Sequence, residues 1–343
     1  METQLIGRQR APEAQSDNAE RNMIVKEKFV WRGKPLLVDA LRVNNHTYVV
    51  FGSFLRTASL KKRWQEDVEN PAEVIQVLKN APLRIDLLRF WQRVPETEPK
   101  FAYYKEWRDV AAIPVTTFDH WWEKQINTKT RNMVRKSKKS GVTIEEVEFS
   151  DELVRGIVGV FSESPVRRGK AFWHYGGDFE SVKKAMSADL EEAVFIAAYY
   201  EKELIGFTKL LITDRSAMVT LILDKMSHRH KSPMNGMIAK AVEICANRKI
   251  PYITYTLWRR GDHGEFQKRN GFQKMPVPEY FVPLTIKGKL ALRLGMHKGL
   301  KGALPERVIV WLLALRSKWY AMKFTGKIRS RSDGDKSVMS APS

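Results

Sequence analysis

The most informative stretch of the sequence, residues 194–223, reads VFIAAYYEKELIGFTKLLITDRSAMVTLIL. It holds three apolar runs, Val194–Tyr200, Leu204–Ile212 and Met218–Leu223, which are separated by the polar peptides EKE and TDRS. Polar connections this short are typical of hairpins. The stretch therefore predicts an antiparallel meander of three strands.

The segments on either side of the meander alternate between helical and β-prone patterns. Upstream, we expect a helix over 117–140 that stops at Gly141, a strand over 142–148 and helices over 151–162 and 178–190. Downstream, we expect a helix from Ser232-Pro233, a strand over 251–257, a short helix over 262–269 and a closing strand over 272–284. Cys245 falls on the apolar face of the helix that begins at Pro233, so we expect a buried thiol.

The N-terminal part reads as a smaller α/β unit. Its β-prone runs are 24–31, 35–41, 47–51, 84–91 and 101–107. One helix is predicted where Asn70 supplies an N-cap and Pro71 occupies the first helical position. The chain then divides into a disordered arm (1–22), this α/β unit (23–112), a larger α/β domain (113–286), a basic amphipathic extension (287–330) and a disordered tail (331–343).

Composition excludes several classes of protein. Apolar residues make up 43% of the 343, which is too many for an intrinsically disordered chain. A single cysteine excludes an internal disulfide framework and favours a reducing compartment. No signal peptide or membrane-spanning run is visible, so we expect a cytoplasmic protein, with peripheral contact at the inner face of the membrane as a further possibility.

Positive charge is concentrated in two places. The formal net charge is +20, and residues 287–331 hold twelve Lys or Arg with Glu306 as the single acid. Apolar and cationic residues alternate at helical spacing between Arg307 and Lys323. This extension either docks on the chain itself, lies on an anionic membrane or contacts nucleic-acid phosphates. A second cluster of six cations lies between Lys129 and Lys139, and is either a solvated helix face or an anion-binding one.

A strand, a loop and a helix follow one another from Met218 to the helix beginning at Pro233. Helix N-termini expose unpaired N–H groups, so this turn favours a diphosphate ligand, unless it is an ordinary capped helix. The residues expected to bind such a ligand are Arg229, Lys231, Ser232 and Asn235. His228 and His230 lie two residues apart with no third ligand nearby, so we expect no metal.

Three motifs, taken in the order in which they occur along the chain, resemble the GNAT acyltransferase superfamily, and more closely its Fem-type bacterial members. They are KTRNMVR (129–135) followed by KKSGV, VFIAA…ELIGF (194–207), and FQKRNGF (266–272). The resemblance implies a GNAT-like mixed, mostly antiparallel sheet flanked by helices. It also implies direct transfer of an acyl group to an amine or hydroxyl, without a metal.

The resemblance assigns a donor site. Backbone groups of Leu221, Ile222 and Leu223 are expected to hold the donor and polarise its carbonyl. The expected donor is an acyl-CoA such as acetyl-CoA. Two departures count against it: the glycine-rich cradle is replaced by HRHKSP (228–233), and Gln267 occupies the place of a proton-donating tyrosine. The alternative donor is aminoacyl-tRNA, which the positive charge favours.

The acceptor side is predicted in the loop between the helices over 151–162 and 178–190. In the GNAT order this loop crosses the acceptor groove, so the candidate general bases are Glu163 and His174, with His228 beside the donor. Acceptor-binding residues are expected to be Arg167, Arg168 and Tyr175. The alternatives are a salt bridge for Glu163 and packing between aromatic neighbours for His174. The acceptor class suggested by analogy is a small molecule or a cell-envelope or polysaccharide precursor. The rival functions are a non-catalytic nucleic-acid-binding protein and a membrane-surface scaffold.

Overall fold

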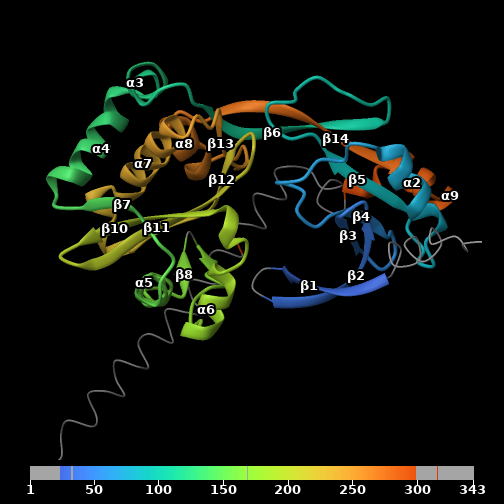
Figure 1. Cartoon of the computed structure of the whole chain (residues 1–343), viewed down its shortest axis with the longest axis horizontal. Helices are drawn as coiled ribbons and strands as arrows, with labels where there is room; N and C mark the ends of the chain where they lie inside the picture. The colour runs from blue at the N-terminus through green and yellow to red at the C-terminus, as the bar shows by residue number, and fades with distance from the viewer. Residues whose placement is uncertain (1–23, 32–33, 168, 299–314, 316–343) are drawn as a thin grey trace, which may run out of the picture. The chain divides into compact units, whose positions relative to one another are not determined.

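The computed structural model describes residues 24–31, 34–167, 169–298 and 315 (Figure 1). They form two compact units. The first contains the described residues up to Arg93, with Lys100–Glu106 and the segment from Pro278 to residue 298. The second contains Val94–Pro99 and Trp107–Val277. Residues 278–286, which the sequence assigns to the larger domain, thus group with the first unit.

The first unit is a sheet with two helices. Its strands pair in the order β1-β2-β3-β4-β5-β14, antiparallel except for the parallel pair β4–β5. The elements are β1 (Ile24–Trp31), β2 (Lys34–Val43), β3 (His46–Phe51), β4 (Thr57–Leu60), α2 (Pro71–Asn80), β5 (Leu87–Trp91), the end of β14 (Gln273–Pro283), α9 (Ile286–Arg293) and the short η5 (Met296–Lys298). β4 was not predicted.

Helix α2 begins as the sequence predicts. The Asn70 side chain accepts a hydrogen bond from the Glu73 amide at 3.3 Å, and Pro71 is the first helical residue. Val74 and Leu78, four residues apart, are buried in a core that includes Leu41, Tyr48 and other strand residues. The amphipathic spacing of α2 therefore fixes which face packs on the sheet.

The second unit holds the predicted meander. Its elements are β6 (Tyr104–Pro114), α3 (Phe118–His120), the π-helix η2 (Trp121–Gln125), α4 (Thr128–Lys139), β7 (Thr143–Val147), α5 (Asp151–Ser162), β8 (Val166–Arg167), β9 (Lys170–Ala171), α6 (Phe179–Met186), η3 (Leu190–Glu192), β10 (Ala193–Tyr200), β11 (Glu203–Ile212), β12 (Ala217–Asp224), η4 (Met226–Lys231), α7 (Pro233–Asn247), β13 (Tyr252–Leu257), α8 (Asp262–Arg269) and the start of β14.

Helices cover both faces of the sheet in the second unit, whose strand order is β6-β13-β12-β11-β10-β7. The pairs β10–β11 and β11–β12 are antiparallel, which confirms the meander. Figure 1 shows α5 and α6 on one side of β10 and β11, and α4, α7 and α8 on the other. Each side has its own apolar core, one beneath α7 and one beneath α5 and α6. Cys245 is buried in the core beneath α7, as predicted.

The predicted helix over 117–140 is wrong, because the chain breaks between η2 and α4. Ile126 and Asn127 are extended, and the Asn127 side chain caps α4 by accepting from the Thr130 amide at 2.9 Å. The buried Trp121 indole donates to the Asn270 carbonyl at 3.0 Å and anchors the π-helix. Helical periodicity continues on both sides of Asn127, so the sequence pattern did not reveal that Asn127 is the N-cap of a separate helix. The helix predicted over 178–190 likewise ends earlier, at Met186.

Strand β12 has two irregular features. A bulge leaves Thr220 as an extra residue, since Val219 pairs with Leu210 and Leu221 with Lys209. Beyond Met218, β12 and β13 pair no further, because only Ala217 and Met218 face Ile253 and Thr254. From Val219 onward, and within the described part of the chain, β12 is therefore hydrogen-bonded to a strand on one edge alone.

The predicted disordered arm and tail, and most of the predicted amphipathic extension, lie outside the described residues. None of the described helices has the length and apolarity that a membrane crossing requires.

Candidate active site

The N-terminal end of α7 lies directly after the loop that leaves β12. Ser232 adopts a left-handed backbone conformation (φ 58°), and its side chain makes no capping hydrogen bond. The Asn235 amide donates to the Asn270 side chain at 3.0 Å, and the Lys231 ammonium lies 3.7 Å from the centre of the Tyr200 ring. The structure thus brings Lys231, Ser232 and Asn235 to one helix end, with two of the three side chains engaged by protein partners.

The Glu163 carboxylate caps the start of η4. Residue 163 follows α5, and its two oxygens accept from the Met226 amide at 2.5 Å, the Ser227 amide at 2.9 Å and the Ser227 hydroxyl at 2.8 Å. Burial raises the pKa of Glu163, but these hydrogen bonds and the nearby Arg167 charge outweigh it and hold the pKa below its usual value. Glu163 therefore stays ionised, and its carboxylate is the anion that binds the amides of this turn.

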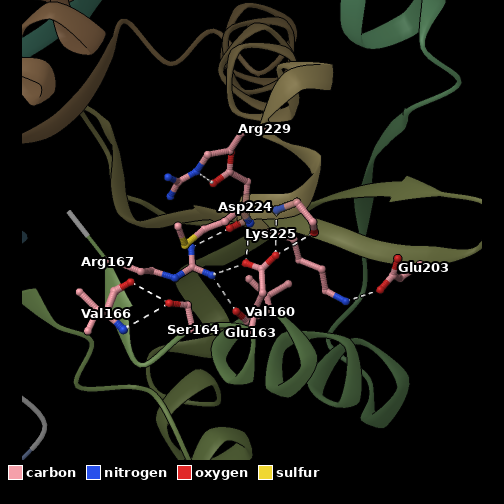
Figure 2. A network of polar contacts seen from close by, with 11 residues as sticks. Val160, Glu163, Ser164, Val166, Arg167, Glu203, Asp224, Lys225 and Arg229 are labelled. Carbon is pink, nitrogen blue, oxygen red and sulfur yellow. Dashed lines mark hydrogen bonds and ion pairs between the residues drawn. The ribbon is translucent and has the colours of Figure 1, made fainter. Parts of the chain in front are cut away.

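Arg167 links α5 to the end of β12, as Figure 2 shows. Its guanidinium is buried and donates to the Asp224 carbonyl at 2.6 Å, the Val160 carbonyl at 2.8 Å and Glu163 at 3.3 Å. The Val160 carbonyl belongs to the last turn of α5, where a cation is favoured by the helix dipole. The predicted acceptor-binding arginine is thus held in a structural network, and Arg168 lies outside the described residues.

Asp224 is an acid that the sequence analysis did not single out. It ends β12, is 3% exposed, and its carboxylate accepts from the Arg229 guanidinium at 3.1 Å (Figure 2). Burial raises the pKa of Asp224, and the charges of Arg229 and Arg167 oppose this rise without cancelling it. The sequence signal that could have identified Asp224 is its position, since this acid directly follows the apolar run Met218–Leu223.

His174 is stacked among aromatic rings. Its ring centre lies 3.7 Å from that of Trp173 and 4.3 Å from that of Phe161. Burial, with a smaller contribution from the Arg167 charge, lowers the pKa of His174 to about 4, so the imidazole is neutral near pH 7. Its Nε2 atom is buried without a hydrogen-bond partner among the described residues. Tyr175, next in the chain, is exposed.

His228 lies on η4. Its Nε2 atom is 3.5 Å from a Glu203 carboxylate oxygen, and the same carboxylate pairs with Lys225. Its ring centre is 5.6 Å from that of Tyr200. The three predicted bases therefore occupy different settings: Glu163 in a cap, His174 in an aromatic stack and His228 beside the Glu203 carboxylate. Their catalytic roles stay predictions.

The residues predicted to hold the donor lie where β12 parts from β13. Ile222 is buried towards α7, whereas Leu221 and Leu223 are partly buried against the core beneath α5. Across the opening, Gln267 on α8 is fully buried and donates to the Tyr255 and Leu257 carbonyls at 3.1 and 3.3 Å. Its amide thus satisfies the irregular end of β13, which explains a glutamine at this position.

A cationic helix face adjoins this region. Helix α4 packs on α7 and contacts η4. Its residues Lys129, Arg135, Lys136, Lys138 and Lys139 are exposed, and α4 carries no acid. Arg131 differs, since it donates to the carbonyls of Trp122 and Ile126 and closes the π-helix. Among the described residues, no group of three or more His, Cys, Asp or Glu could hold a metal ion.

Comparison with known proteins bears on the fold. No family model matches the sequence, and no curated protein matches it. Solved structures do match. The C-terminal domain of a protein assigned as a lysylphosphatidylglycerol synthetase from Agrobacterium fabrum superposes with a TM-score of 0.52 at 14% identity, covering 75% of this chain and 87% of that one. The chain has a GNAT-like fold.

Two further solved structures are similar at lower scores. FemX superposes with a TM-score of 0.49 at 10% identity, covering 81% of this chain and 92% of that one. A tandem GNAT protein from the clavulanic acid biosynthesis pathway gives 0.40 at 9% identity, with coverage of 73% and 83%. The predicted fold class, a mixed and mostly antiparallel sheet flanked by helices, is confirmed.

Proposed function

We propose that the second unit is an acyltransferase that takes an aminoacyl group from an aminoacyl-tRNA and passes it to an amine or hydroxyl of a cell-envelope precursor. The observation that carries the proposal is the parting of β12 from β13 beside the start of α7. There, β12 has an edge from Val219 to Asp224 that pairs with no described strand, and free backbone groups suit the binding of an activated carbonyl.

The η4 turn favours this donor over acyl-CoA. The amides of Met226 and Ser227, which would otherwise face a diphosphate, are bonded to Glu163. The two amides that a pyrophosphate could use at this turn are therefore already occupied, which disfavours acyl-CoA as the donor. Acetyl-CoA, the first expectation from the sequence, is therefore the second candidate.

The exposed cations of α4 supply the other argument. They form a face without acids, adjoining η4 and α7, and a nucleic-acid body offers phosphates along an extended surface. One of the similar solved structures is named as a domain of a lysylphosphatidylglycerol synthetase. This name supports an aminoacyl group as the transferred group and an envelope component as the acceptor.

In the proposed reaction the acceptor amine or hydroxyl gives a proton to a base and attacks the ester carbonyl, the bond to the tRNA 3′-oxygen breaks, and that oxygen takes a proton. Among the predicted bases, His174 has an Nε2 atom without a partner in the described part of the chain, so that atom is free to take a proton. Both oxygens of Glu163 already accept hydrogen bonds and are less available.

The test is a ligand panel followed by a transfer assay. A donor that binds the folded chain at a hundred times its Kd stabilises it by about 2.7 kcal/mol. We expect charged tRNA to raise the Tm, and acetyl-CoA and longer acyl-CoAs to leave it unchanged. A response to acyl-CoA alone would overturn the donor assignment but not acyl transfer, whereas no response to any donor would overturn both.

A charge variant tests the role of α4. The variant Lys136→Gln/Lys138→Gln/Lys139→Gln should weaken tRNA binding and make the affinity less sensitive to salt, by about one unit of slope for each phosphate that is no longer neutralised. The matched control is Lys28→Gln/Lys79→Gln/Lys105→Gln, which removes three exposed cations from the first unit. Equal weakening by both variants would contradict a specific role for α4.

A further inference from the structure

Helix α9 of the first unit buries its small residues and exposes its large ones. Gly288 and Ala291 face inward. Outward, Ile286 is 89% exposed, Leu290 56% and Leu294 65%. The three lie four residues apart, so they form one stripe along the helix. Water-facing apolar residues in a continuous row indicate a surface that another body covers.

Helix α9 cannot rotate about its axis to bury Ile286, Leu290 and Leu294 instead of its small residues. A Cβ atom on Gly288 would lie 1.9 Å from the Asp86 carbonyl oxygen, which shows how closely α9 approaches the sheet. Thr285 fixes the start of the helix, since its hydroxyl accepts from the Gly288 amide at 3.0 Å and donates to the Asp86 carboxylate at 2.9 Å. The stripe is therefore held outward by the packing of α9.

Phe54 extends the stripe on a neighbouring loop. It is 62% exposed, and its carbonyl accepts from the Lys287 ammonium at 2.6 Å. The same ammonium lies 3.6 Å from the centre of the Phe54 ring. We define the α9 surface as Phe54, Ile286, Leu290 and Leu294 with the flanking cations Lys287, Lys289 and Arg293. Residues 285–298 contain no acid.

We infer that the α9 surface binds the face of an anionic lipid bilayer, with the apolar stripe in the headgroup boundary and the flanking cations on lipid phosphates. Such a surface satisfies both kinds of side chain at once, because acyl chains take the apolar residues and headgroups take Lys289 and Arg293. Neither cation forms an ion pair with a described residue. The inference concerns the first unit and does not depend on the proposed transfer reaction.

Charge disfavours the other occupants. Residues 299–323 carry Lys301, Arg307, Arg316, Lys318 and Lys323 against Glu306, so this segment would bring more positive charge to a positive surface. A second copy of the chain meets the same repulsion when like surfaces face one another. Nucleic acid would neutralise the cations but leave the apolar stripe without a partner.

Vesicle sedimentation of the full chain tests the inference. We expect binding to vesicles of equal parts phosphatidylglycerol and phosphatidylcholine, and none to phosphatidylcholine alone. The variant Ile286→Gln/Leu290→Gln/Leu294→Gln should lower the affinity about tenfold or more, since three apolar side chains lose their place in the lipid. The control Leu36→Gln/Leu37→Gln removes exposed apolar residues from β2 and should bind as the wild type does. Wild-type affinity in the α9 variant, or no binding by the wild type, would overturn the inference.

A fluorescent probe reports on the same surface. The native thiol of Cys245 is fully buried and should not react. A thiol-reactive, environment-sensitive dye added to the Leu290→Cys variant therefore labels residue 290. Its emission should shift to the blue when phosphatidylglycerol vesicles are added, whereas the dye on Leu37→Cys should not respond. A dye at residue 290 that is already blue-shifted without vesicles would show that the chain itself covers α9, and would overturn the inference.

Discussion

The Arg167 guanidinium donates to Glu163 at 3.3 Å, four residues earlier in the chain, and to the Asp224 carbonyl, 57 residues later. This single side chain therefore joins the end of α5 to the end of β12 (Figure 2). Glu163 completes the link by capping η4 through the amides of Met226 and Ser227. Side chains at the end of α5 thus hold the turn between β12 and α7, although α5 and α7 lie on opposite faces of the sheet.

Removing the charge at residue 163 should loosen this turn. Glu163→Gln weakens the charge-assisted hydrogen bonds from Met226, Ser227 and Arg167, and we expect it to lower the free energy of unfolding by about 2 kcal/mol in urea denaturation. The control is Glu203→Gln, where the half-exposed Glu203 forms a surface pair with Lys225 that is worth less than about 0.5 kcal/mol. A decrease no larger than in the control would contradict the capping role.

Two glycines in α5 should respond in opposite directions to the same substitution. A Cβ atom on Gly156 would lie 2.8 Å from the Leu204 Cβ atom, so Gly156→Ala must shift α5 from β11 and should cost about 1–3 kcal/mol. On Gly159 its nearest neighbour would be Lys225 Nζ at 3.7 Å, so Gly159→Ala should stabilise the helix by up to about 1 kcal/mol. Thermal unfolding measures both, and equal effects would contradict the packing of α5 on β11.

His174 should make the chain less stable in acid. Its folded pKa of about 4 lies below the unfolded value near 6.5, so between these values the unfolded chain binds the extra proton. The stabilisation is complete above pH 6.5 and is lost as the pH falls towards 4, on the order of 3 kcal/mol in all. Urea denaturation across this range should show a shallower pH dependence for His174→Phe, which keeps an aromatic ring in the stack. Parallel curves for the two proteins would show that the imidazole titrates normally.

The Cys245 thiol should be inert in the folded chain. It is fully buried, and burial raises its pKa to about 12, so almost no thiolate exists near neutral pH. Ellman's reagent should leave the native protein unmodified and react with one thiol per chain in urea. Rapid reaction under native conditions would mean that α7 opens readily from the sheet.

Local patterns predicted the second unit well. The helices α5 and α8 begin and end at the predicted residues, and the meander has the predicted antiparallel pairing, because periodicity and short polar turns are encoded within single segments. Strand β4 was missed since its four residues gain their structure by pairing with β3 and β5. The break before α4 was missed because Asn127 sits between two helical patterns.

The site was less predictable than the fold. The sequence places Glu163, Arg167 and the β12–α7 turn in separate segments, and nothing in the spacing indicates that a carboxylate reaches amides 63 and 64 residues away. Asp224 was passed over for a related reason: its burial and its altered pKa come from the folded surroundings. Interactions of this kind depend on tertiary packing.

The bulge at Thr220 absorbs one extra residue of β12 and so keeps the direction in which the last residues of the strand point. Val219 and Ile222 both face α7, three positions apart, whereas an uninterrupted strand would alternate every second residue. If Thr220 took a regular place in the strand, the residues after it would change phase, and Asp224 would turn its acid into the aliphatic and aromatic cluster under α5. Deleting Thr220 would instead remove the bulge and leave the last four residues of β12 on the sides that they now face. A threonine that carries no charge is thus held out of register, and the buried acid stays on the α7 side.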